Sequence, residues 1–273
     1  MDKTENKSEL IKLIIVYAVD LAIMIGLSYA LPNLAPNMPI IAKAALIYIL
    51  LLVPVIVYAI KKGDCTAEAF GFRKIKVSTF FFTILLSIVS APMYMFANVL
   101  SQLVVPNVLI QNMDNLMGDS MGASFIAMAV FAPIAEEIIC RGFFTNRLKK
   151  TVPFAAAAVI SAVMFGLLHL NINQFCYTLV LGIIFAYVNK ASGSIFTSII
   201  MHFLVNASNI GIVLLAQKTL QNMGMDLAET AETSRQNAGA MIFAVVFYGI
   251  LAIISFFLSR KVIRAIAKRE GNE

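Results

Sequence analysis

Charged residues are scarce in this chain of 273 residues. Asp, Glu, Lys and Arg make up 13% of it, about half the share found in soluble globular domains, while hydrophobic residues make up 60%. The apolar residues occur in blocks of roughly 16 to 25, the length that crosses ~30 Å of hydrocarbon. These values exclude a soluble globular protein, and we expect most of the chain to lie within a lipid bilayer.

Cysteine is also rare. Cys65, Cys140 and Cys176 show no metal-ligand spacing, and two of them lie in apolar surroundings. This pattern argues against a disulfide framework, and we interpret the three as small packing residues.

The net charge of +6 does not indicate a nucleic-acid partner. The basic residues stand in short clusters beside apolar blocks and not along a solvated face. We therefore expect the lipid bilayer, and no nucleic acid, to contact these residues.

The apolar blocks predict about eight membrane spans. Because lipid offers no partners to backbone polar groups and the blocks lack the alternation of a barrel, the predicted fold is all-α. The connections are too short for a soluble domain, so we predict a polytopic transmembrane helical bundle that forms a single membrane domain, residues 1–273. The predicted spans are Leu10 to Leu31, Ile40 to Ile60, Thr79 to Leu103, Ser124 to Phe144, Pro153 to Leu170, Gln174 to Val188, Ile195 to Leu215 and Ala240 to Leu258.

The distribution of Lys and Arg sets the predicted orientation. Basic residues favour cytoplasmic loops, and the N-terminus, every even-numbered connection and the C-terminal tail are basic, whereas the odd-numbered connections hold almost no cations. Eight spans with both termini in the cytoplasm follow. The second connection, Cys65 to Ser78, mixes Phe and Ile with Arg and Lys, so it is either a segment on the membrane surface or an ordinary basic loop.

Polar residues inside the predicted spans are not scattered. A charged side chain at mid-bilayer costs roughly 2.5 to 3.5 kcal/mol on insertion scales, so such residues usually face a partner or a wet cavity. Apart from Asp20 in the first span, whose role the sequence does not explain, they gather in spans four, five and seven: Glu136, Glu137, Arg141, His169, His202 and Asn206.

The fourth span carries two glutamates with separable roles. Glu137 and Arg141 are four residues apart, where a helix lets them pair. Glu136 points about 100° away around the helix, free to face a cavity and act as a general base. A purely structural ion pair is the alternative, but two adjacent buried glutamates are a costly way to stabilise a bundle.

The two histidines of the chain complete the candidate site. Measured from the basic ends of their spans, Glu136, His169 and His202 lie at depths of roughly 20, 24 and 18 Å, so all three can meet at one level. His202 and Asn206 are one turn apart and project to the same side. Such a set suits attack of an activated water on a carbonyl with an imidazole and an amide on the oxyanion. The same Glu136, His169 and His202 are also able to hold a zinc ion, which is possible but not required.

The order of these residues resembles the CPBP family of membrane proteases, also called the Abi family, which includes CAAX prenyl endopeptidases and bacteriocin-processing proteins. The resemblance covers residues 124–215, the expected catalytic core: Glu136-Glu137-x-x-x-Arg141, Phe165-x-x-x-His169 and His202-x-x-x-Asn206. It implies an intramembrane endopeptidase for peptide or protein substrates. Glu136 with His169 would activate water, His202 and Asn206 would stabilise the oxyanion, and Glu137 with Arg141 would support the site. The family is described both as metalloproteases and as metal-independent glutamate proteases, and the chain looks most like its bacterial branch, in the plasma membrane.

Two other functions remain open at this stage. A noncatalytic scaffold or bacteriocin-immunity protein would keep the fold and bind a peptide without cleaving it. A proton-coupled transporter would use Glu136 and the histidines as a relay, but we find no internal repeat of the kind many transporters have. No feature of the sequence indicates the oligomeric state.

Overall fold

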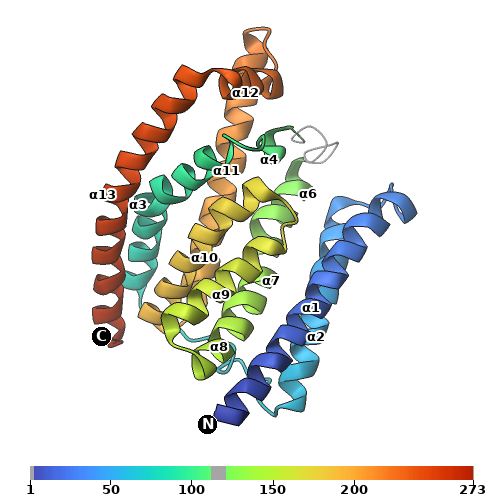
Figure 1. Ribbon diagram of the computed structural model, residues 1–273, viewed down its shortest axis with the longest axis vertical. Helices are drawn as coiled ribbons and strands as arrows, with labels where there is room; N and C mark the ends of the chain where they lie inside the picture. Colours follow the sequence, from blue (N-terminus) through green and yellow to red (C-terminus); the bar gives the residue numbers. More distant parts are fainter. Residues whose placement is uncertain (1–2, 112–120, 273) are drawn as a thin grey trace.

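The computed structural model describes residues 3–111 and 121–272, and within them it consists of helices without a strand. Figure 1 shows long helices packed side by side, with both chain termini at the same end of the bundle. The helices are α1 (Lys3–Leu34), α2 (Ile40–Lys61), α3 (Val77–Ser101), α4 (Val108–Gln111), α6 (Met121–Phe125), η1 (Ile126–Phe131), α7 (Ala132–Glu137), η2 (Ile138–Thr145), α8 (Asn146–Thr151), α9 (Phe154–Leu167), α10 (Ile172–Ser192), α11 (Phe196–Asn222), α12 (Leu227–Gln236) and α13 (Ala238–Glu270).

Seven helical stretches in the described residues are long and apolar enough to cross a membrane. One of them, Met121–Thr151, is the continuous run from α6 to α8. The chain is therefore an integral membrane protein with an all-α fold, as predicted.

The fifth predicted span differs from the expectation. Instead of Pro153 to Leu170, the helix α9 has 14 residues and is about 21 Å long, less than the ~30 Å of hydrocarbon. It ends early because the chain reverses after Leu167, where Leu170 adopts a left-handed φ of 52° and Asn171 caps α10 by accepting a hydrogen bond from the backbone of Gln174 at 2.9 Å. Together with the seven longer stretches, the shorter apolar helix α9 makes eight passes within the described residues.

The second connection is a loop without a helix of its own. Residues 66–71 form turns, and Phe70 is buried against Phe143 with ring centroids 6.4 Å apart. Ser194 holds the loop to the start of α11 by donating to the carbonyl of Arg73 at 2.5 Å. The apolar residues of this segment therefore serve protein packing.

The polar helix α12 was not predicted. Asp226 caps it by accepting from the backbone of Glu229 at 2.8 Å, and it lies at the end of the bundle away from the termini (Figure 1).

The two larger of three apolar clusters build most of the interior. One joins α1, α2, η2 and α9, and the other joins α3, α10, α11 and α13. Phe165 belongs to the first cluster and Phe185 to the second, and both rings contact the His202 ring, at centroid distances of 5.5 and 5.1 Å. The candidate site thus lies where the two clusters meet.

Candidate active site

The two adjacent glutamates of α7 face different neighbours, as the helical geometry predicts. Glu137 is fully buried, and its Oε1 accepts from Arg141 Nη1 at 3.0 Å, so the predicted ion pair forms. Glu136 is part-exposed and accepts from the hydroxyl of Tyr48, on α2, at 2.9 Å. The Glu137 carboxylate is therefore buried in an ion pair, whereas the Glu136 carboxylate faces a cavity.

The ion pair extends to a third side chain, His202. Its Nδ1 lies 3.1 Å from Oε1 of Glu137, while its Nε2 lies 3.7 Å from Oε2 of Glu136. Because Glu137 is paired with a cation and only accepts, Nδ1 carries the hydrogen of this contact. Glu137 thereby fixes the orientation of the imidazole and directs Nε2 toward Glu136.

Arg141 is held from both faces by aromatic rings. Its guanidinium carbon lies 4.4 Å from the Phe165 centroid and 5.2 Å from the Phe185 centroid. Such cation–π contacts, together with the Glu137 carboxylate, compensate for burial of the charge. The position of Glu137 therefore depends on three helices and not on α7 alone.

His169 sits in the turn after α9, with its ring edge-on to Phe165 at 5.0 Å. Its Nδ1 is 3.0 Å from the carbonyl oxygen of Phe165. A carbonyl only accepts, so Nδ1 donates and the neutral ring keeps its lone pair on Nε2. The neighbouring Leu170, at φ 52°, has a conformation that bulky residues rarely adopt, and such strain is concentrated at functional sites.

Asn206 has a contact that the local helix geometry explains. The segment η1 is a π-helix, in which a carbonyl accepts from the fifth residue along. For Met128 that residue is Pro133, which has no N–H to donate. The side chain of Asn206 donates to the Met128 carbonyl instead, at 2.9 Å, and retains a second N–H.

One cavity brings these side chains together. It has a volume of about 300 Å³, and Glu136, His169, His202 and Asn206 all line it. Residues of the α1–α2 hairpin, including Met24, Ile47 and Tyr48, form part of its wall, so the cavity lies between that hairpin and the other helices that line it. Tyr48 lies outside the predicted core of residues 124–215 and was missed. The one signal for it in the sequence was a hydroxyl within an apolar block.

The three proposed zinc ligands do not form a ready coordination sphere. Among residues 3–111 and 121–272, no group of three His, Cys, Asp or Glu side chains stands close enough to hold a metal ion. The chemistry below therefore uses only protein side chains and water.

Comparisons with known proteins point to the region that carries these residues. A model of the family described as "Type II CAAX prenyl endopeptidase Rce1-like" matches residues 119–208. In Bacillus subtilis (strain 168), the "Putative membrane peptidase YdiL" is 30% identical to this chain over 81 residues, which are 30% of this chain and 33% of that protein. The match thus spans about a third of the relative's length, and no solved structure matches. Residues 119–208 contain every one of the motif residues from Glu136 to Asn206, so the part of the chain that is similar to this family is the part that carries the candidate site.

Proposed function

We propose that this protein is an intramembrane endopeptidase that hydrolyses peptide bonds of hydrophobic or membrane-associated substrates. The observation that carries the proposal is the cavity of about 300 Å³ that Glu136, His169, His202 and Asn206 line together. Four such side chains at one cavity within the helical bundle are more than packing requires, since each polar group inside a membrane is costly unless it has a role or a partner. The family match and the relative's printed name agree with it.

In the proposed reaction Glu136 is the general base. Its carboxylate takes a proton from a water molecule while the oxygen of that water forms a bond to the peptide carbonyl carbon. His169 accepts a second hydrogen bond from the water through its free Nε2. When the tetrahedral intermediate collapses, the C–N bond breaks and Glu136 returns the proton to the leaving amine.

His202 and Asn206 would stabilise the negative oxygen of the intermediate. Asn206 has its second N–H for this purpose. For His202 to donate from Nε2, both ring nitrogens must carry protons, and Glu137 supplies the countercharge at Nδ1. Arg141 in turn keeps Glu137 ionised and in place, so Glu137 and Arg141 are positioning residues in this mechanism.

The lining of the cavity indicates the kind of substrate. Met24, Ile40, Ala44 and Ile47 of the α1–α2 hairpin are apolar, and all of them line the cavity beside the polar group. An apolar peptide segment can pack against this wall while its carbonyl reaches Glu136. We infer that substrates enter between the hairpin and the remaining helices.

A matched pair of variants tests the proposal. Full-length protein in liposomes is incubated with a peptide library, and the products are identified by mass spectrometry. Glu136→Gln should abolish cleavage, because the amide keeps the shape but cannot take a proton. Glu229→Gln, on the exposed surface of α12, should cleave like the wild type. Cleavage that persists in Glu136→Gln contradicts the mechanism, and a wild type that cleaves nothing in the library favours the noncatalytic scaffold or immunity function.

A further inference from the structure

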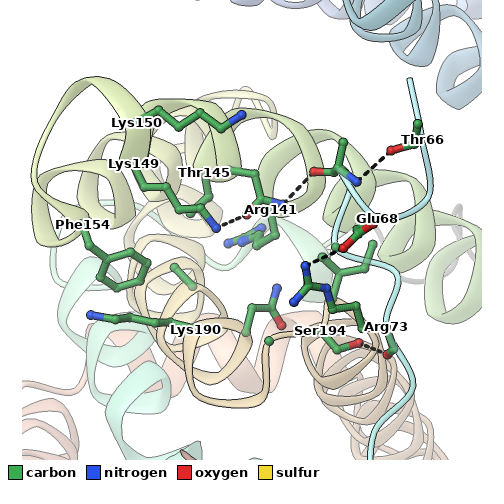
Figure 2. Close-up of a pocket in the computed structure, with 17 residues that line it drawn as sticks. Thr66, Glu68, Arg73, Arg141, Thr145, Lys149, Lys150, Phe154, Lys190 and Ser194 are labelled. Atoms are coloured by element: carbon green, nitrogen blue, oxygen red, sulfur yellow. Dashed lines mark hydrogen bonds and ion pairs between the residues drawn. The ribbon is translucent and has the colours of Figure 1, made fainter. Parts of the chain in front are cut away.

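A second and larger cavity, of about 850 Å³, is lined by the residues that Figure 2 draws as sticks. Figure 1 shows α8, which contributes to this lining, at the end of the bundle that holds the chain termini. The cavity lies among the loop after α2, the residues around α8, the start of α9 and the connection from α10 to α11. These segments include the even-numbered connections whose basic residues set the predicted orientation. The cavity is therefore at the level where helices end and lipid headgroups begin.

The lining of this cavity is strongly basic. Five cations and one carboxylate face it: Arg73, Arg141, Lys149, Lys150, Lys190 and Glu68. Glu68 is paired with Arg73 at 3.0 Å. Within the described part of the chain the three lysines have no acidic partner. Lys149 donates to the amide oxygen of Asn146, and Lys190 stands 4.5 Å from the Phe154 ring centroid. Because Arg73 is paired with Glu68 and Arg141 with Glu137, the three lysines leave an excess of three positive charges around one cavity.

Arg141 supplies the observation that distinguishes this cavity from a solvated basic surface. Its side chain is 1% exposed, yet it forms part of the lining, and Figure 2 shows it amid the lysines, Glu68 and Arg73. Nη1 is engaged by Glu137, but Nε and Nη2 have no hydrogen-bond partner in the described structure. Buried guanidinium donors are nearly always satisfied, and they suit the oxygens of a phosphate.

We propose that this cavity binds a phosphate group, and that the group belongs to the headgroup of an anionic phospholipid. Basic pockets between transmembrane helices on the cytoplasmic side are suited to such headgroups. Arg141 would contact the phosphate from inside, with Lys149, Lys150 and Lys190 around it. A volume of about 850 Å³ is larger than a single ion needs and accommodates a headgroup. The site is separate from the cavity of Glu136, and the inference does not depend on protease activity.

The three lysines allow a test that leaves the fold intact, because all are exposed. The triple variant Lys149→Gln, Lys150→Gln, Lys190→Gln is compared with a control triple, Lys61→Gln, Lys261→Gln, Lys268→Gln, whose lysines are exposed and lie outside the cavity. A third variant replaces the cavity lysines with Arg. The readout is the thermal unfolding midpoint of the full-length protein in phosphatidylcholine micelles as phosphatidylglycerol is added, since a ligand that binds the folded state raises it.

The wild type, the control triple and the Arg variant should show a saturable rise of the midpoint. In the cavity triple the apparent dissociation constant should increase roughly a hundredfold. Each lysine near an anionic lipid surface strengthens binding by a factor of about five, and three such factors multiply. Equal responses of the cavity triple and the control triple would overturn the proposal. A second arm adds inorganic phosphate without anionic lipid: a response to the lipid alone identifies the headgroup as the source, while an equal response to phosphate alone overturns the lipid assignment in favour of a soluble phosphate.

Discussion

His202 Nδ1 lies 3.1 Å from Oε1 of Glu137, the same oxygen that accepts from Arg141. Glu137 thus holds a cation on one side and orients an imidazole on the other, inside a membrane-embedded bundle. Its partner Glu136 is one residue away and faces the cavity. One helix, α7, thus supplies both the carboxylate proposed to react, Glu136, and the carboxylate that orients His202, Glu137.

Removing the charge of Glu137 should destabilise the protein. Glu137→Gln leaves the Arg141 guanidinium buried without a counterion, and breaking a buried pair in this way costs about 3 to 5 kcal/mol. We expect a clearly lower midpoint of thermal unfolding by circular dichroism, together with reduced cleavage. Glu232→Gln removes one member of the more exposed pair with Arg235 and should leave the midpoint nearly unchanged. Equal midpoints for the two variants would show that the buried pair has no structural role.

Tyr48 should matter for activity, although no motif includes it. Its hydroxyl donates to Glu136 at 2.9 Å, so Tyr48→Phe frees the carboxylate to move. A hydrogen bond to a charged group is worth about 1.5 to 3 kcal/mol, so we expect kcat to fall roughly tenfold or more with KM little changed. Tyr58, on the same helix, also donates to a glutamate, Glu9, but does not line the cavity. Tyr58→Phe should keep the wild-type kcat, and a similar loss in both variants would indicate a general effect on α2.

The two roles of Asn206 can be separated. Asn206→Ala leaves the Met128 carbonyl without a donor and removes an oxyanion donor, so stability should fall by about 1 to 3 kcal/mol and kcat by roughly a hundredfold. Pro133→Ala supplies the missing backbone N–H to Met128. The double variant should therefore regain stability but not cleavage. Recovery of cleavage in the double variant would mean that Asn206 is structural only.

We expect the buried carboxylate of Asp20 to lower the stability of the folded protein. It is fully buried in α1, and neither carboxylate oxygen has a hydrogen-bond partner within the described structure. Asp20→Val replaces it with an apolar side chain of similar shape and should raise stability by about 1 to 3 kcal/mol. Asp64 offers the contrast, because it pairs with the buried Arg147 and its replacement by Val should lower stability. If Asp20→Val unfolds more easily than the wild type, the carboxylate has a partner or a function of its own.

Treatment with a chelator tests whether cleavage requires a metal ion. Because the described His, Asp, Glu and Cys side chains form no group of three able to hold an ion, we expect the wild-type cleavage rate to persist after prolonged treatment with a strong chelator. Loss of cleavage that added zinc restores would contradict this expectation. It would also require Glu136, His169 and His202 to move together when zinc binds.

The sequence predicted the helices and the site residues for different reasons. Apolar blocks of membrane length defined the helices, and α2 and α3 begin and end within two residues of the predicted bounds. The candidate residues of α7, η2, α11 and the turn after α9 could be proposed because their spacing along the chain is local. Tyr48 could not, because its contact with Glu136 joins positions 88 apart.

The end of α9 was also missed, although a signal existed. The apolar run continues through Leu167, Leu168 and Leu170, so hydropathy alone extends the helix to Leu170. Asn171, three residues before Gln174, is the kind of side chain that caps a helix start, and it marks where α10 begins. The basic cavity was beyond prediction, because loops far apart in the sequence form it.

The short helix α9 affects the membrane itself. One face of α9 is exposed, with Val159 47% and Leu167 43% accessible, so lipid chains lie against a helix of about 21 Å beside neighbours that are longer. A bilayer accommodates such a hydrophobic mismatch by thinning locally. The thinned patch brings the aqueous phase closer to the turn that carries His169 than it comes along the longer helices. Acyl-chain length thereby becomes part of the environment of the site, since it sets the distance between the aqueous phase and the turn that carries His169.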